Sequence, residues 1–237
     1  MLPLPQLLWL AAIAAMASGV AAVDRKGALQ LMLSRPIVLA PVLGALLGDG
    51  RGGLMLGVPL ELLFLGGVNL GGSIPDNEAL LAGALTSMVV PAGLAGHGVD
   101  APLAALGLAL LIPLSVVGRS LERSSEHRNA QLAEQAVARA AAGDAGAARL
   151  NLLGLVLPFG GTAAICAACV LASPLLALLQ RGLPDRLASG LGAGWHVVWA
   201  LAAASAIRAI RDPRAPALAA VTAAAVVALF LLLRGMP

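Results

Sequence analysis

The stretch that decides the fold is Gly52-Gly-Leu-Met-Leu-Gly-Val-Pro-Leu-Glu61-Leu-Leu-Phe-Leu-Gly-Gly-Val-Asn-Leu-Gly71, an apolar, glycine-rich run around one carboxylate. No other charged residue lies between Arg51 and Asp76. An unpaired carboxylate at membrane depth costs about 3 kcal/mol, so such groups are kept mainly where they face a cavity, a substrate or an ion. The sequence therefore makes Glu61 the first candidate for a functional residue. The alternative is a buried structural hydrogen bond.

The composition supports placing this stretch in a membrane. Of the 237 residues, 59% are hydrophobic and 11% are charged, whereas an ordinary soluble domain is about 25% charged. The mean hydropathy is +0.92. We predict an all-α, polytopic membrane protein that forms a single membrane domain over residues 1–237. It is expected to contain about six to eight membrane segments.

Polar and proline-containing interruptions divide the chain into these segments. Residues 5–23 are predicted to be a retained membrane segment, because the basic region that begins a signal peptide is missing before them. The segment 150–179 is predicted to break near Pro158 and Pro174, since proline removes a helix hydrogen bond. The other apolar segments outside the glycine-rich region are 80–95, 101–117, 187–210 and 215–233.

Two short segments flank the turn Gly48-Asp-Gly-Arg-Gly-Gly53. The first, 31–47, contains Pro36 and Pro41, and the second covers 54–70. Short apolar segments interrupted by glycine and proline are typical of re-entrant hairpins, which need protein or water around them. We therefore predict a re-entrant hairpin near residues 36–70.

Basic residues orient the predicted segments. Three loops, 24–35, 119–149 and 208–214, carry eleven of the 15 Lys and Arg residues. Lys and Arg favour the cytoplasmic side of a membrane. All three loops fall on one side if the hairpin returns to the side on which it starts. The charge distribution thus supports the hairpin and predicts that these loops are cytoplasmic.

Residues 119–149 form the only substantial polar segment and are predicted to be a cytoplasmic amphipathic arm. Leu121, Leu132 and Ala136 can share one apolar stripe of a helix, which Gly143 ends. One interpretation is a solvated helical arm. The other is a docking surface for a soluble partner, and the two interpretations are compatible.

Several kinds of site lack support in the sequence. Cys166 and Cys169 lie in an apolar run and are predicted to be core residues rather than a redox or metal pair, since a metal site would need further ligands. His97, His127 and His196 share no ligand spacing. No Ser/His/Asp arrangement suggests nucleophilic catalysis, and no basic patch interleaved with aromatics suggests nucleic-acid binding. We expect no catalytic residue, metal, cofactor or nucleic-acid partner.

Further polar residues follow Glu61. Asn69 lies eight residues later, close to two helical turns, so one face can present both side chains. Asp76 and Asn77 come next. Carboxylates and amides together offer acceptors and donors that suit a polyol such as a sugar. The alternative for Asp76 and Asn77 is that they cap a helix beginning near residue 78.

Three runs in this region resemble one known family: Arg35-Pro-Ile-Val-Leu-Ala-Pro-Val-Leu-Gly-Ala-Leu-Leu-Gly-Asp49, Gly57-Val-Pro-Leu-Glu61-Leu-Leu-Phe-Leu-Gly66 and Asn69-Leu-Gly-Gly-Ser-Ile-Pro75-Asp76. Together they are similar to the IIC subunit of the mannose/fructose/sorbose family of bacterial phosphotransferase systems (PTS). The resemblance covers roughly residues 24–95. The order and approximate spacing of the motifs carry it, because each motif alone is far less specific.

The resemblance implies a multi-pass permease of the bacterial cytoplasmic (inner) membrane. Such a subunit binds and translocates a hexose-type sugar, coupled to phosphorylation of that sugar by partner subunits. The partners are a second membrane subunit, IID, and the cytoplasmic phosphocarrier proteins IIB and IIA. A homo-oligomer within a IIC–IID complex is expected. The chain itself would be a non-catalytic component of the complex.

The resemblance also implies roles for individual residues. Glu61, Asn69 and Asp76 would contact the sugar, and Asn77 joins them as a candidate contact. The structural or gating residues of the hairpin would be Arg35 and Asp49. Two other classes of function stay open at this point. One is an ion-coupled secondary transporter with Glu61 as the coupling carboxylate, and the other is a non-transporting scaffold that recruits a soluble partner through residues 119–149.

Overall fold

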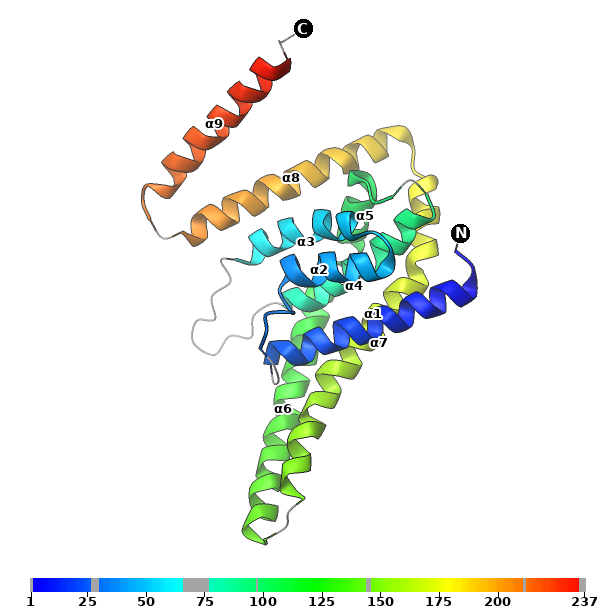
Figure 1. Cartoon of the computed structure of the whole chain (residues 1–237), viewed down its shortest axis with the longest axis vertical. Coiled ribbons are helices and arrows are strands. Elements are labelled where there is room, and N and C mark those ends of the chain that lie inside the picture. Colours follow the sequence, from blue (N-terminus) through cyan, green and yellow to red (C-terminus); the bar gives the residue numbers. More distant parts are fainter. Residues whose placement is uncertain are drawn as a thin grey trace.

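The computed structural model describes residues 2–26, 30–65, 77–96, 98–143, 146–210 and 212–234, and every regular element in these ranges is a helix (Figure 1). The predicted all-α class is therefore confirmed. Asn69, Asp76 and His97 lie outside the described residues. The helices are α1 (Leu4–Lys26), α2 (Pro36–Leu47), α3 (Gly50–Phe64), α4 (Glu78–Leu94), α5 (Ala101–Leu111), α6 (Leu114–Ala141), α7 (Ala147–Arg181), α8 (Asp185–Ala209) and α9 (Ala215–Arg234).

Three described helical segments are long and apolar enough to cross a membrane: Leu4–Arg25, Arg149–Arg181 and Asp185–Ala209. Helices α5 and α6 pass the same test together, with a bend of 45° between them, which gives up to four spans. Three more apolar segments are too short for this test, although the sequence predicts membrane segments there as well. They are Pro36–Leu47, Glu78–Leu94 and Ala215–Ala224. The polytopic character follows from the long segments.

Helix α4 forms the centre of the body. Its residues from Ala79 to Gly93 are all buried, and it packs against α7, α2, α3 and α5 (Figure 1). A helix without a polar face is stable only where it is covered on every side. Small residues let the neighbours approach, because a Cβ on Gly107 of α5 would lie 2.4 Å from Val89 Cγ2. This rigid centre supports the shorter helices around it.

Helices α2 and α3 form the predicted hairpin. Gly48 ends α2 with a φ of 109°, which favours glycine. Asp49 caps α3 by accepting a hydrogen bond from the Gly52 N–H, 2.8 Å long. The two helices touch through their backbones, since a Cβ on Gly53 would lie 2.3 Å from the Ala40 carbonyl oxygen. The hairpin is thus a closely packed pair of helices from Pro36 to Phe64.

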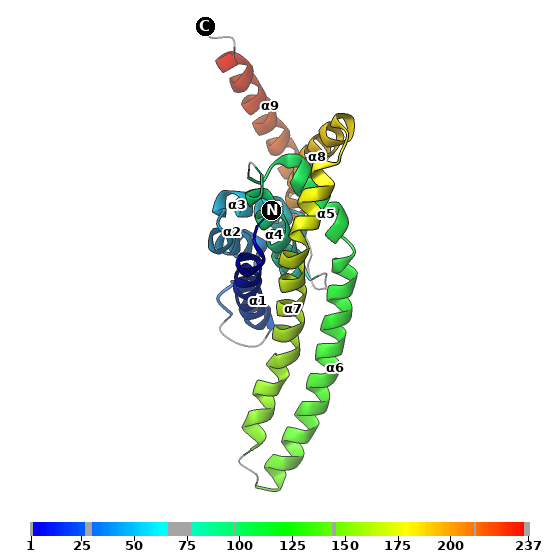
Figure 2. The ribbon, with the colours of Figure 1, turned by 90° about the vertical axis from the view of Figure 1, so that its right-hand side faces the viewer.

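Helices α6 and α7 lie side by side and extend beyond the body as an arm (Figures 1 and 2). Two glycines of α7 leave room for side chains of α6. A Cβ on Gly154 would lie 2.9 Å from Asn129, and one on Gly161 would lie 2.8 Å from Leu121. The α6 helix begins at Leu114, so the helix predicted over 101–117 instead ends at Leu111. The helix breaks at this point because Pro113 has no N–H with which to continue the hydrogen bonding of α5.

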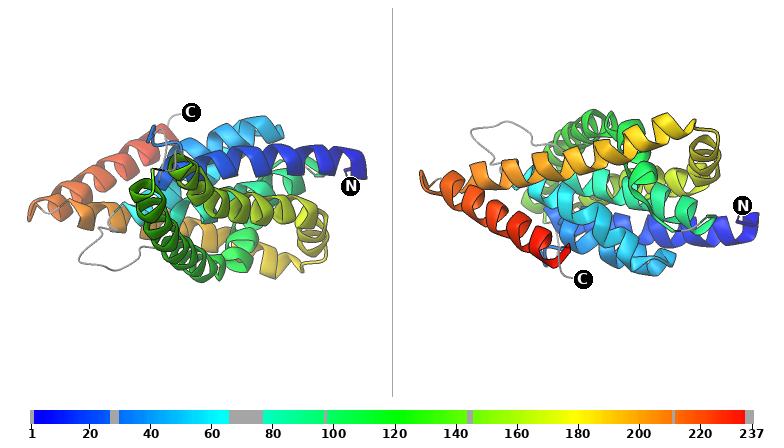
Figure 3. Two further views of the ribbon diagram at one scale, coloured as in Figure 1. Left: turned by 90° about the horizontal axis from the view of Figure 1, so that it is seen from below. Right: turned by 90° about the horizontal axis from the view of Figure 1, so that it is seen from above.

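The predicted breaks near Pro158 and Pro174 are wrong, because α7 is continuous across both. A proline removes one backbone hydrogen bond, and membrane helices tolerate this loss where neighbours support them. Helix α7 has that support from α1, α4 and α6. Helix α8 packs on α5 and α3 at the outside of the body, and α9 diverges from the C-terminal end of α8 (Figure 3).

Contacts between helix termini define two ends of the body. At the first, called the basic end, Arg25 at the C-terminus of α1 pairs with Glu122 of α6. Ser205 near the C-terminus of α8 donates a 2.8 Å hydrogen bond to the Leu63 carbonyl of α3. The N-terminus of α4 lies at this end too, through the ion pair of Glu78. The structure therefore brings together segments that flank the basic loops of the sequence.

The second end, called the opposite end, holds the other termini of the same helices. The turn of the hairpin meets the C-terminus of α4, since a Cβ on Gly48 would lie 3.2 Å from Leu94 Cδ1. The loop after α4 meets the C-terminus of α7, where Gln180 Nε2 donates to Asp100 Oδ1 at 2.9 Å. The two ends are separated by the length of α4.

Candidate functional site

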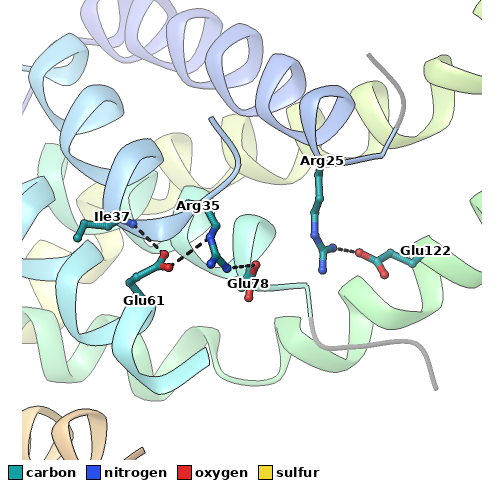
Figure 4. Close-up of polar contacts among 6 residues, drawn as sticks. All are labelled: Arg25, Arg35, Ile37, Glu61, Glu78 and Glu122. Atoms are coloured by element: carbon teal, nitrogen blue, oxygen red, sulfur yellow. Dashed lines mark hydrogen bonds and ion pairs between the residues drawn. The ribbon is translucent and has the colours of Figure 1, made fainter. Parts of the chain in front are cut away.

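Glu61 lies in the last turn of α3 and is 8% exposed. Its Oε1 is 3.4 Å from Nε of Arg35, the residue just before α2 (Figure 4). Its Oε2 accepts a hydrogen bond from the Ile37 N–H, also at 3.4 Å. The first N–H groups of a helix have no partner within that helix and carry a partial positive charge. The N-terminus of α2 and Arg35 therefore both stabilise the buried carboxylate.

Arg35 also reaches a second carboxylate. Its Nη1 is 3.6 Å from Oε1 of Glu78, the first residue of α4 (Figure 4). The side chain of Arg35 is 39% exposed, that of Glu78 is 21% exposed and that of Glu61 is 10% exposed. One guanidinium thus joins the start of α2, the end of α3 and the start of α4. The three side chains together carry one net negative charge.

The loop that presents Arg35 is shaped by a buried aspartate. Asp24, which is 2% exposed, accepts hydrogen bonds from the Leu31 N–H at 2.6 Å and the Leu33 N–H at 2.8 Å. A carboxylate that accepts backbone N–H groups fixes the path of a loop. The C-terminus of α1 therefore positions the chain that leads into the Arg35–Glu61 pair.

A second ion pair lies nearby at the basic end. Arg25 contacts Glu122, which is 4% exposed (Figure 4). Both border a small cavity of about 20 Å³ with Asn77, Ser125 and Thr162. This cavity has room for about one water molecule. The sequence gives no local signal for this pair, because the two residues are 97 positions apart. The pair fastens the arm to α1.

The structure places the predicted residues in three groups. Glu61 and Arg35 are in contact, while Asp49 lies at the far turn of the hairpin and caps α3. Asn77 caps α4, with its Oδ1 accepting from the Leu80 N–H at 2.9 Å. This is the alternative role that the sequence left open for Asn77, and its proposed contact with a ligand stays a prediction.

Glu78 is a site residue that the sequence reasoning missed. It begins α4 directly after the polar run at 76–77, so its position behind two candidate contacts was the available signal. Cys166 and Cys169 are free and buried in the core, as predicted. Within the described ranges, no group of three or more His, Cys, Asp or Glu side chains is arranged to hold a metal ion.

The arrangement suits hydrogen bonding to a neutral polar ligand. A carboxylate accepts hydrogen bonds from hydroxyl groups, and a guanidinium with five N–H donors can donate to hydroxyl oxygens beside it. Glu61 is held by Arg35 and the N-terminus of α2, and Arg35 is held by Glu61 of α3 and Glu78 of α4. Groups held in this way lose little freedom when they bind.

Comparisons with known proteins come from sequence and from structure. The profile of the family described as "PTS system sorbose-specific iic component" matches residues 6–221. The mannose-specific EIIC component of the PTS from Escherichia coli (strain K12) is 32% identical over 92 residues, which cover 39% of this chain and 32% of the relative. The fructose permease IIC component of Bacillus subtilis (strain 168) is 36% identical over 110 residues, which cover 45% of this chain and 39% of the relative. These matches thus span about a third of the relatives' length.

Two solved structures share the fold. One is a membrane-protein chain with a TM-score of 0.70 and 23% identity, and the comparison covers all of this chain and 94% of the other. The second belongs to the cryo-EM structure of the mannose transporter ManYZ with microcin E492, with a TM-score of 0.56, 20% identity and the same coverage. Both are evidence for the architecture alone.

The family profile covers nearly the whole chain, from α1 into α9. The resemblance found in residues 24–95 is therefore confirmed and extends much further along the sequence. The chain is a multi-pass protein of the bacterial inner membrane, as predicted. It belongs to the IIC components of the mannose/fructose/sorbose family of bacterial phosphotransferase systems.

Proposed function

We propose that this chain is the sugar-permease subunit of a phosphoenolpyruvate-dependent phosphotransferase system. It binds a hexose-type sugar and moves it across the membrane, and partner subunits phosphorylate the sugar. The observation that carries this proposal is the buried Glu61, held by Arg35 and the N-terminus of α2 on a closely packed hairpin. The chain contributes binding and movement and is not the catalyst of phosphoryl transfer.

Glu61 is the main sugar contact in this proposal. A sugar hydroxyl donates to its carboxylate, and Arg35 donates to a neighbouring hydroxyl oxygen. Asn69, Asp76 and Asn77 are proposed as further contacts on the strength of the family resemblance. The names of the relatives include mannose and fructose, which supports a hexose-type sugar as the substrate class.

The hairpin is the proposed moving element, with Arg35 and Asp49 as structural or gating residues. Arg35 joins it to α4 through Glu78 on the basic end, and Asp49 fixes its turn on the opposite end. Lys and Arg favour the cytoplasm, so the basic end faces the cytoplasm in this proposal. We treat residues 1–237 as one membrane domain, in which α4 connects the hairpin to the rest.

The proposed partners are a IID membrane subunit and the cytoplasmic IIB and IIA proteins, in a complex that holds more than one copy of this chain. The outer face of α7 supports a membrane partner. Leu152, Leu153 and Val156 are exposed by 67%, 46% and 55%. They lie near Gly154, which packs on Asn129 in the polar part of α6. Exposed apolar side chains that gather on one face commonly mark a surface that another protein covers, so we assign this face to IID.

The experiment compares energy sources for uptake. Membrane vesicles that contain this chain and its partner subunits are loaded with phosphoenolpyruvate, and uptake of labelled mannose, fructose and sorbose is measured. The proposal expects uptake of at least one sugar as its phosphate, with no loss when an uncoupler collapses the ion gradients. Uptake that ignores phosphoenolpyruvate and collapses with the uncoupler would instead favour an ion-coupled transporter. No uptake of any of the three sugars, despite assembled subunits, would favour a scaffold.

A further inference from the structure

A polar hollow lies at the opposite end of the molecule, far from the Glu61 cluster. It has a volume of about 640 Å³ and lies between the turn that joins α4 to α5 and the turn that joins α7 to α8. Sites for small molecules commonly have volumes of about 300–1,000 Å³. Its walls are mostly small residues, and its polar side chains are Asp100, Gln180, Arg181 and Asp185.

Three of these polar side chains, those of Asp100, Gln180 and Arg181, are held in place by hydrogen bonds. Gln180 Nε2 donates to both carboxylate oxygens of Asp100, at 2.9 and 3.2 Å. Asp100 also caps α5 by accepting from the Leu103 N–H at 2.9 Å. Arg181 donates to the Ala95 carbonyl at the end of α4. Polar groups fixed in this way are ready to bind without first being ordered.

The backbone on one side of the hollow is open to a ligand. The turn after α4 closes so tightly that a Cβ on Gly93 would lie 2.8 Å from the carbonyl carbon of Gly98. Gly98 has a φ of 96°, a backbone conformation that residues other than glycine rarely adopt. At Gly93, Gly96 and Gly98, which line the hollow, no side chain covers the backbone, so a polar ligand can approach the backbone there closely.

The charges select the chemical class of the ligand. Two carboxylates and one guanidinium give the hollow a net negative charge, which disfavours an anion. The carboxylates accept from hydroxyl groups, while the guanidinium and the amide of Gln180 donate to hydroxyl oxygens. A neutral, polyhydroxylated molecule fits this set, and its phosphorylated form does not.

The segment that forms one wall of the hollow contacts the hairpin that carries Glu61. A Cβ on Gly52 would lie 2.6 Å from Val99 Cγ2, and one on Gly48 would lie 3.2 Å from Leu94 Cδ1. Both partners belong to the segment that forms one wall of the hollow, between Ala92 and Asp100. A ligand held here therefore lies beside the turn of the hairpin, at the end away from the basic loops.

We propose that this hollow is an outer docking site, where the unphosphorylated sugar binds before it reaches Glu61. The proposal rests on the sugar-permease function proposed above and adds a separate site to it. The docking site raises the local concentration of sugar at the hairpin. It does not take part in translocation itself, so its loss weakens apparent affinity more than maximal rate.

The test uses the complete system with whichever of mannose, fructose or sorbose is taken up fastest. Initial rates of phosphoenolpyruvate-dependent uptake are measured against external sugar for Asp185→Asn, which keeps the shape of the side chain, and for Ala188→Trp, which fills the hollow. Arg186→Gln is the matched control, because Arg186 is the neighbour of Asp185 and does not line the hollow. Amounts of protein in the membrane are matched by immunoblot.

The expected result is a KM raised on the order of tenfold for both variants, with kcat within about twofold of wild type and the control unchanged. The phosphate of the same sugar, added outside, should not compete. An unchanged KM in both variants at wild-type membrane levels would overturn the docking site while leaving the permease function intact. A wild-type system that takes up none of the three sugars would overturn both proposals together.

Discussion

The Arg35 guanidinium lies 3.4 Å from the Glu61 carboxylate, and this pair connects the two ends of the α2–α3 hairpin that lie at the basic end. Arg35 precedes α2 and Glu61 is in the last turn of α3, so the pair closes the hairpin opposite its turn. The same guanidinium reaches Glu78 at the start of α4. Arg35 is therefore part of the candidate site and also fastens the hairpin to α4.

Replacing Arg35 by glutamine should destabilise the protein and also impair transport. The change leaves the mostly buried Glu61 with only the Ile37 N–H as a partner among the residues that the structure describes. Removing one member of a buried pair costs about 3–5 kcal/mol, and the 39% exposure of Arg35 reduces the expected loss to about 1–2 kcal/mol. Thermal unfolding of the purified protein in detergent would measure this loss of stability.

The double variant Arg35→Gln/Glu61→Gln separates pairing from simple damage. If the pair is real, the second substitution removes the unpaired charge and restores part of the stability lost in Arg35→Gln. Additive losses would show that the two side chains do not interact.

The Arg25–Glu122 pair should hold the arm to α1. Glu122→Gln removes a buried negative charge beside Arg25 and is expected to cost about 2–4 kcal/mol. Faster cleavage of the arm in limited proteolysis would accompany the lower stability. Glu134→Gln is the matched control, because Glu134 lies further along α6 and is exposed. Equal behaviour of the two variants would contradict the role given to Glu122.

Adding one methyl group should have opposite effects at two glycines. Gly53→Ala places a Cβ 2.3 Å from the Ala40 carbonyl oxygen, so α2 and α3 must separate, at an expected cost of about 1–3 kcal/mol. Gly190→Ala meets nothing within 4 Å in the middle of a helix and should stabilise the protein by about 0.5–1 kcal/mol. Unfolding midpoints that fall for both or rise for both would argue against this packing of the hairpin.

The hairpin could be predicted from the sequence because its signals are local. A glycine that ends α2, an aspartate that caps α3 and two short apolar runs lie next to one another in the chain. The arm was also visible, as the polar segment after residue 118. These features depend on backbone conformation and on polarity, which neighbouring residues largely decide.

Other features depend on partners far along the chain and could not be predicted. Glu122 was placed on a solvated arm, and the structure buries it because Arg25 lies opposite. The prolines of α7 look like helix breakers, yet packing on α1, α4 and α6 keeps that helix continuous. Glu78 was passed over because only Arg35, from another helix, gives it a role.

The most direct test of the central claim is sugar uptake by Glu61→Gln in the assembled system. Phosphoenolpyruvate-dependent uptake is compared with wild type and with Glu134→Gln, an exposed carboxylate of α6, at matched membrane levels and with co-purification of the partner subunits verified. Loss of a charged hydrogen bond to the sugar predicts a fall in kcat/KM of about 10- to 100-fold for Glu61→Gln and none for Glu134→Gln. Wild-type uptake by Glu61→Gln would contradict the account.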